Sequence, residues 1–195
     1  MRAWDVAPSR FALAGRLGWA RLGAMNSIDL ISDLAARPLA ALGLLWERLD
    51  DDHLNAHPCG HPNSPAWLLW HSGREIDQQV ADMGGPEVWN EQGWAQRFGL
   101  DVAPDEHGYG HTPDQARAIV VHDRTLLRDY LAAVTLASLT WLAELTEQDL
   151  DEVVDEAWDP PVTRGVRLVS VYADALEHVG QAAYVTGMTD LPVEN

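Results

Sequence analysis

The chain has 195 residues and a formal net charge of −17, and all 13 of its basic residues are arginine. This length supports one domain with a hydrophobic core, and the negative charge argues against binding to nucleic acid or to an anionic membrane. The single cysteine, Cys59, excludes an internal disulfide bond, and no apolar run is long enough to cross a bilayer. We therefore expect a cytoplasmic protein in which Cys59 is a loop or packing thiol rather than a nucleophile.

Residues 1–24 differ in composition from the rest of the chain. They contain four arginines and one acid, Asp5, and their apolar stretches are too short for a signal peptide. Met25 begins a more typical segment. We expect residues 1–24 to be an N-terminal extension, either an upstream addition or an accessory helix, and residues 25–195 to form the folded domain.

The first predicted helix begins at Ser27 or Asp29 and ends near Leu49, and Pro38 should kink it or split it. The loop that follows contains three histidines at four-residue spacing: His53, His57 and His61. Proline and glycine residues between them disfavour a helix, so the spacing does not bring the three rings to one face. We interpret these histidines as loop residues rather than as a metal-binding tract.

The second predicted helix begins with Ser64 as its N-cap and Pro65 as its first residue, and it ends near Met83. About thirty residues of turns and loop follow. Such a long connection often covers the mouth of a pocket, although its aromatic side chains can equally pack into the bundle. The aromatic residues in question are Trp89, Trp94, Phe98 and Tyr109.

A third helix, the longest, is predicted over residues 113–145, followed by a short turn that starts at Thr146 and a loop around Pro160. The final helix is predicted over residues 163–187, with Gly187 in the left-handed position at its end. No alternating strand pattern is present. The expected architecture is all-α: a four-helix bundle with a long cross-over connection between helices two and three.

The final helix carries Asp174 and His178 one turn apart on one polar stripe, which also contains Arg167 and Gln181. A carboxylate and an imidazole at this spacing can bind one cation, but two donors need a third from elsewhere. His71 on the second helix is the candidate. The alternative is a solvated polar face, since D-x-x-x-H is common by chance, and spacing alone leaves both interpretations open.

Four segments carry a resemblance to a known family: SPAWLLWH (64–71), VWNEQGWAQRFGL (88–100), GYGHTP (108–113) and WDPPVTRGVRLVSVYADALEHVGQAAYVTGM (158–188). Over residues 27–190 the chain resembles the DinB-like superfamily of four-helix bundles. More closely, it resembles the branch of thiol S-transferases related to mycothiol-dependent maleylpyruvate isomerase. The HVGQAAY motif, with an acid one turn before its histidine, is the most specific feature.

The resemblance implies a divalent metal, zinc first and nickel second, bound by His71, Asp174 and His178. Many members have a second histidine at the position of Asp174, and the isomerase has a glutamate there. Three protein ligands leave an open position, as in catalytic zinc sites. A thiol that enters this position loses its proton and can attack an electrophile, so mycothiol or a similar thiol is the expected cosubstrate.

We assign catalytic roles to Asp174 and Arg167, and contacts with the thiol or substrate to Trp67, Arg167 and Gln181. Arg167 is expected either to bind a carboxylate of the ligand or to form a surface salt bridge with a neighbouring acid, Asp174 or Glu177. Glu75, one turn after His71, is expected to be a solvated residue more often than a supporting acid.

The sequence therefore predicts a metal-dependent transferase that uses a low-molecular-weight thiol against small electrophiles, as in detoxification. Two alternatives remain: a non-catalytic metal-binding or small-molecule-binding stress protein, and a thiol-dependent isomerase of an unsaturated diacid. The expected partners are a small thiol and an electrophilic substrate, with no nucleic acid or membrane. A homodimer is an assembly that bundles of this kind often form.

Overall fold

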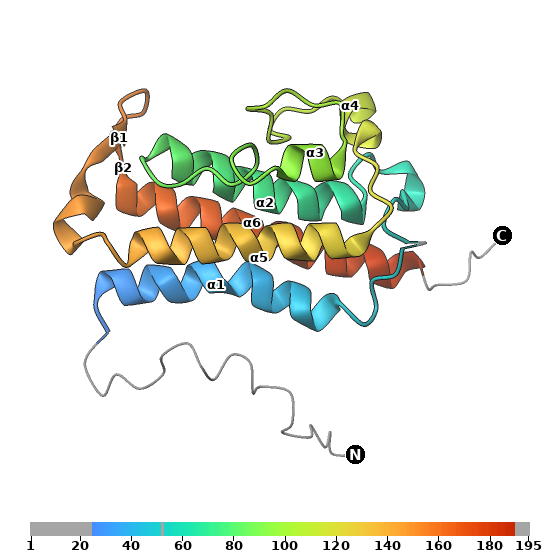
Figure 1. Ribbon diagram of the computed structural model, residues 1–195, viewed down its shortest axis with the longest axis horizontal. Coiled ribbons are helices and arrows are strands. Elements are labelled where there is room, and N and C mark those ends of the chain that lie inside the picture. The colour runs from blue at the N-terminus through green and yellow to red at the C-terminus, as the bar shows by residue number, and fades with distance from the viewer. Residues whose placement is uncertain (1–24, 52, 190–195) are drawn as a thin grey trace, which may run out of the picture.

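The computed structural model describes residues 25–51 and 53–189, so the expected extension at 1–24 lies outside the described part. Four long helices dominate it: α1 (Ser27–Leu45), α2 (Pro65–Asp82), α5 (Arg124–Leu142) and α6 (Arg164–Thr189). The prediction of an all-α four-helix bundle is confirmed (Figure 1). None of the helices in residues 25–51 and 53–189 is both long and apolar enough to traverse a bilayer.

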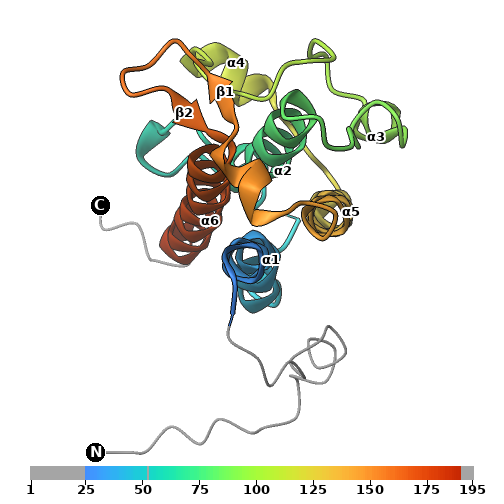
Figure 2. The same ribbon diagram turned by 90° about the vertical axis from the view of Figure 1, so that its left-hand side faces the viewer.

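The four helices form a square in which α1 and α2 occupy opposite corners. Each of these two packs against both α5 and α6, as the end-on view shows (Figure 2). The side view shows that α2 and α5 run in the same direction (Figure 1). The chain must therefore return along the bundle after α2 before it can begin α5, which is the physical reason for the long cross-over.

The predicted helix starts are confirmed, but α1 differs from its prediction in length and continuity. Ser64 caps α2 by accepting a hydrogen bond from the Trp67 backbone N–H at 3.2 Å. Helix α1 ends at Leu45 instead of residue 49, and it continues without a break through Pro38, which is buried. Packing against α5 and α6 stabilises helical backbone on both sides of this proline, and such tertiary packing outweighs its local cost.

The predicted helix over 113–145 is in fact two helices, α4 (Pro113–Ala118) and α5. Between them, Ile119 adopts an extended conformation, and the Asn55 side chain bonds to both the backbone N–H and the carbonyl of Val121 (3.1 and 2.8 Å). Asp123 then caps α5 by accepting a hydrogen bond from the Thr125 N–H. The partner that interrupts the helix is thus 66 residues away, which local periodicity cannot reveal.

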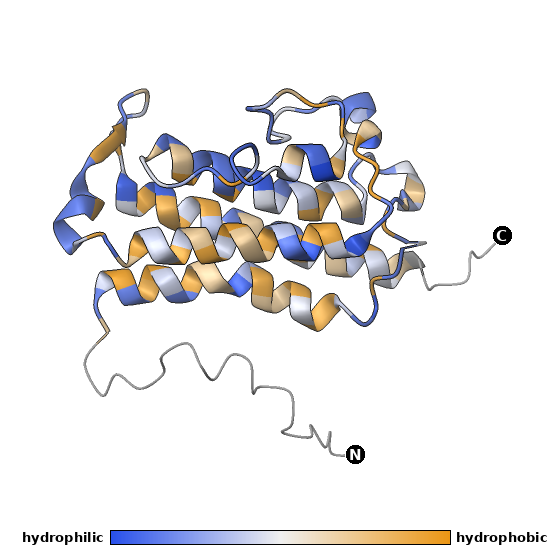
Figure 3. Ribbon diagram, viewed as in Figure 1, coloured by the Kyte–Doolittle hydropathy of each residue, from blue (hydrophilic) through white to orange (hydrophobic). Residues whose placement is uncertain are grey.

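The segment before α6 also departs from the prediction, which contained no strands. A short helix, η3 (Glu147–Asp151), leads into an antiparallel hairpin of β1 (Val153–Asp155) and β2 (Val162–Thr163). These strands are too short to show alternation. Figure 3 shows the contrast between hydrophilic η3 and hydrophobic β1. At the other end of α6, Gly187 lies inside the helix, which continues to Thr189.

The histidine-rich loop between α1 and α2 is confirmed as a loop. Its only regular element is the short helix η2 (Pro58–Gly60), and Cys59 lies there with an exposed side chain. The ring of His57 bonds to the His61 carbonyl, and His53 pairs with Asp50. These histidines therefore interact with nearby backbone and side-chain groups of the loop.

Helix α2 is buried on all sides over residues 64–77, because the connection and its short helix α3 (Trp94–Phe98) lie along its outer face (Figure 1). Three aromatic rings of the connection pack around Tyr130 of α5 at centroid distances of 5.2–5.7 Å, whereas Tyr109 is exposed. These rings belong to Trp89, Trp94 and Phe98. The connection thus packs its aromatic residues inward and also encloses the polar side chains of α2.

Candidate metal centre

Four potential metal donors meet between the antiparallel helices α2 and α6. His71 and Glu75 come from one turn of α2, and Asp174 and His178 from one turn of α6. One nitrogen or oxygen of each lies within 4.8 Å of the others. In the described residues no other group of three or more histidine, cysteine or acidic side chains meets this criterion. The three residues predicted from the sequence are therefore together, and Glu75 joins them.

Hydrogen bonds fix both imidazoles with Nε2 toward the other donors. Nδ1–H of His71 donates to the His107 carbonyl, and Nδ1–H of His178 donates to Oε1 of Gln181 at 3.0 Å. Because Nδ1 carries the proton in each ring, Nε2 keeps its lone pair. The Nε2 atoms lie 3.8 Å from Glu75 Oε2 and 3.7 Å from Asp174 Oδ1. Gln181 therefore orients His178, whereas the sequence analysis predicted a contact of Gln181 with the thiol or substrate.

Burial sets the electrostatics on the α2 side of the cluster. Burial lowers the pKa of His71 to about 4, although the hydrogen bond to His107 opposes the shift. Burial, followed by the hydrogen bond to Asp174, raises the pKa of Glu75 to about 10. Their 3.8 Å contact is therefore an approach of two neutral groups rather than an ion pair. Two imidazoles and a buried carboxyl whose Oε1 has no hydrogen-bond partner among the described residues are a donor set that fits a divalent cation.

Trp67 packs behind the two histidines. Its ring centroid lies 4.6 Å from that of His71 and 6.1 Å from that of His178. Its Nε1–H donates to Nδ1 of His111 at 3.1 Å, and the other ring nitrogen of His111 donates to Glu106 at 2.5 Å. Trp67 is 5% exposed and does not line the cavity, so it supports the histidines instead of facing a ligand.

A buried arginine and aspartate on α2 hold the connection in place. Arg74 is fully buried and donates to the carbonyls of Pro104 and Glu106, both at 3.0 Å. It also pairs with Asp77, which accepts hydrogen bonds from two backbone N–H groups of the connection and from the Tyr130 hydroxyl. This network positions the residues next to His107, whose carbonyl binds His71.

Gly108 lets the connection approach the site closely. Its φ is +100°, and a Cβ there would lie 2.9 Å from Nδ1 of His71. Gly108 belongs to the GYGHTP segment, but no role was predicted for it from the sequence. Arg74 and Asp77 were not predicted as functional residues either. The sequence does contain one indication of Arg74 and Asp77: they are opposite charges three residues apart in a predicted helix.

Three of the four donors, His71, Glu75 and Asp174, line a cavity of about 450 Å³ between α2, α6, the hairpin and the connection. Half of the Asp174 side chain is exposed there. The rim is apolar and aromatic, because Tyr109, Trp158 and Val166 all line the cavity and are exposed. A small molecule thus has a route to the donors.

Arg167 lines the cavity, but its partners differ from those expected. Its guanidinium binds Asp155 of β1 at 2.6 Å and Oε1 of Gln79 at 3.3 Å, and no pairing with Asp174 or Glu177 is present in the described residues. The backbone N–H of Ala157, together with Arg167, holds the pKa of Asp155 below its usual range. Arg167 therefore ties the hairpin to the bundle at the wall of the cavity.

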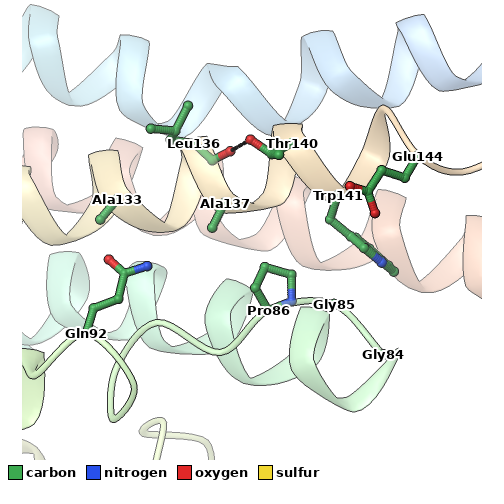
Figure 4. A pocket seen from close by; sticks show the side chains of 10 residues that line it. All are labelled: Gly84, Gly85, Pro86, Gln92, Ala133, Leu136, Ala137, Thr140, Trp141 and Glu144. Carbon is green, nitrogen blue, oxygen red and sulfur yellow. Dashed lines mark hydrogen bonds between the residues drawn. The ribbon is translucent and has the colours of Figure 1, made fainter.

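A second hollow, of about 620 Å³, lies between residues 84–86 and α5. Figure 4 shows Trp141 and Glu144 at one end and Ala133 and Gln92 at the other. Glu144 is the single titratable residue among those that line it. This hollow lacks the donors found in the first cavity.

Comparisons with known proteins agree with this fold. The chain is similar to a conserved protein from Enterococcus faecalis of known crystal structure, with 36% sequence identity and a TM-score of 0.75. The similarity covers 84% of this chain and 96% of the other. No curated protein matches the chain. A sequence profile of the DinB superfamily matches residues 36–182, and the chain therefore belongs to the DinB superfamily.

Proposed function

We propose that this protein is a metal-dependent transferase that joins a low-molecular-weight thiol of the mycothiol type to small electrophiles. The observation that carries the proposal is the cluster of two imidazoles and two carboxyls, three of which line a cavity. Membership of the superfamily accounts for the helical bundle. The proposed chemistry is inferred from the four metal donors. A divalent cation bound there would stabilise thiolate and so make an entering thiol nucleophilic at neutral pH.

The residues of the chain provide three further contributions. His107 and Gln181 hold the two imidazoles in one orientation, with Nε2 toward the other donors. Trp67 and the buried face of α2 keep water away from one side of the cluster. The rim, formed in part by Tyr109 and Trp158, offers apolar and aromatic surface to an electrophile.

The charge of the cavity favours an uncharged thiol carrier. Arg167 is the only arginine among the described residues that line the cavity, and Asp155 already neutralises it. Asp82 and Asp174 add negative charge. We therefore expect a thiol on a neutral sugar, such as mycothiol, to react faster than the anionic glutathione. The diacid isomerase is less well supported, because its substrate would need a cationic side chain that is not already paired.

The proposal is tested by thiol consumption with a haloarene, measured on protein of known metal content with and without a chelator. We expect turnover that a chelator abolishes and added metal restores. The H178A variant should lose both metal and turnover, because it removes an imidazole donor. H122A is the matched control, since His122 is exposed and outside the cluster, and it should behave as the wild type.

Two results would contradict the transferase. Turnover that persists in chelator would remove the role of the metal. Stoichiometric metal without turnover across mycothiol, glutathione and simple thiols would instead favour the non-catalytic metal-binding stress protein.

A further inference from the structure

We propose that Glu75 is a fourth metal-binding residue, in addition to His71, Asp174 and His178. The inference rests on the metal site of the proposed function and goes beyond the three ligands that the family resemblance implies. It concerns a residue that the sequence pattern placed on a solvated face. Three independent features of the structure support it.

The first feature is position. Glu75 lies one turn after His71 on the same face of α2, so both side chains project toward α6. Two donors of one ion are at most about 4.4 Å apart, because each bond is about 2.0–2.2 Å long. The separation of 3.8 Å between Glu75 Oε2 and His71 Nε2 is within this limit. It is close to the 3.7 Å that separates Asp174 and His178 on the facing helix.

The second feature is an unsatisfied buried atom. Glu75 is 3% exposed, and its Oε1 has no hydrogen-bond partner among the described residues. An isolated buried carboxyl oxygen costs free energy and is uncommon in folded proteins. Trp70 Nε1 is the one other unpaired side-chain atom buried on the described part of α2, whereas the charged and hydroxyl side chains buried there have partners: Arg74 and Asp77 bond to the connection, and Ser72 bonds to two carbonyls. A bound cation would satisfy Glu75 in the same way.

The third feature is charge balance. Asp174 alone would leave a divalent cation with one uncompensated positive charge in a largely buried site. Glu75 is protonated without a cation, and the loss of its proton when a cation binds would provide the second negative charge. Two imidazoles and two carboxylates are a donor set common to several first-row divalent metals. Because four protein donors complete a tetrahedral shell, a thiol could then join only an ion that accepts a fifth donor.

Metal affinity of purified, demetallated protein tests the assignment, with zinc and nickel titrated separately in competition with a chromophoric chelator. E75Q keeps the size of the side chain and can still donate a hydrogen bond to Asp174, but it removes the anionic donor. D82N is the matched control, because Asp82 is an exposed carboxylate on the same helix that lines the same cavity. Thermal unfolding in chelator verifies that both variants are folded.

We expect E75Q to weaken metal binding by at least about tenfold, in line with the losses seen when the surroundings of a metal are altered, and D82N to stay within about twofold of the wild type. Wild-type affinity in E75Q, or an equal loss in D82N, would overturn the assignment. These results are separable from the proposed function. Glu75-dependent metal binding without thiol turnover leaves this inference standing and removes the transferase. Thiol turnover in a protein whose metal binding does not depend on Glu75 would remove this inference and leave the transferase standing.

Discussion

The orientation of the His71 imidazole depends on the backbone of the connection at His107 and Gly108. The His107 carbonyl that accepts its hydrogen bond precedes Gly108, whose positive φ turns the chain so that backbone, and not a side chain, lies against the ring. Orientation of a metal-binding histidine through its second nitrogen commonly affects affinity by 10–100-fold. The site therefore extends beyond the donors themselves.

The G108A substitution tests this dependence. The added Cβ would lie 2.9 Å from His71 Nδ1 and would also meet the rings of Trp70 and Trp67, so the imidazole must shift. We expect metal affinity to fall at least about tenfold, measured by chelator competition.

G110A is the control for G108A. Gly110 also has a positive φ, +73°, but nothing lies within 4 Å of its Cβ position. The G110A variant should have a lower free energy of unfolding because of backbone strain alone, and its metal affinity should be unchanged. An equal loss of affinity in both variants would show that general loosening of the connection, and not the contact with His71, is responsible.

Among the elements, α2 is unusual because its residues up to Asp77 are buried on every side and yet include polar and charged side chains. A bundle helix normally leaves one face in water, but the cross-over covers that face of α2. The buried pair of Arg74 and Asp77 makes this possible, because each finds its hydrogen-bond partners among backbone groups of the cross-over. The element that carries half of the metal donors is thus enclosed by the segment that orients them.

The close approach of α2 to α5 should make Gly73 intolerant of substitution. A Cβ at Gly73 would lie 2.6 Å from the ring of Tyr130, which is itself fully buried and bonded to Asp77. We expect G73A to lower the free energy of unfolding by about 1–3 kcal/mol through overpacking. G43A is the matched control in α1, where nothing lies within 4 Å, and it should raise stability by about 0.5–1 kcal/mol. Urea unfolding of both variants measures these changes, and a G73A variant as stable as the wild type would contradict the close packing.

The N-cap of α5 should contribute a pH-dependent part of the stability. Hydrogen bonds from Thr125, both from its side chain and from its backbone, hold the pKa of Asp123 below its usual range. The stabilisation is therefore fully present above the pKa of an unfolded aspartate, about 3.9, and it is lost as the pH falls through the lower pKa of the folded state.

Comparison of D123A and D123N by urea unfolding measures this contribution. At pH 7, D123A should be about 1 kcal/mol less stable than the wild type, and D123N close to it, because asparagine also caps helices. As the pH falls below about 4, the difference in stability between the wild type and D123A should disappear. The difference between D123N and D123A should stay the same, because asparagine does not titrate. A gap between wild type and D123A that does not change with pH would refute the role of the carboxylate.

At the scale of the whole molecule, the candidate site joins α2 to α6, two helices whose sequences are about a hundred residues apart. A cation shared between them would act as a cross-link that exists only in the folded state. Binding to the folded state alone adds about 2.7 kcal/mol to stability when the free ligand is at one hundred times its Kd.

Removal of the metal should therefore lower the melting temperature. We expect the wild type to melt several degrees lower in chelator than with added zinc or nickel, since about 1 kcal/mol shifts the Tm of a chain of this size by about 2–4 °C. Calorimetry with and without chelator measures the shift. H178A should show no such difference, and a wild type with the same Tm in both conditions would contradict a shared cation.

The sequence by itself determined the four-helix architecture, the starts of α1, α2 and α6 and the pairing of Asp174 with His178. These features depend on local rules: apolar periodicity, capping residues such as Ser64, and the four-residue spacing of one helical turn. Such rules act within one segment, so a single chain displays them without its partners.

Only the tertiary structure decided the surroundings of Glu75, the partner of Arg167 and the break before α5. Each depends on a segment distant in the chain: the cross-over that buries α2, the hairpin that supplies Asp155, and the loop that supplies Asn55. A polar residue on a helix has the same local pattern whether water or another segment covers it. Burial is a property of the assembled molecule, and it is burial that turns Glu75 from a surface acid into a candidate metal ligand.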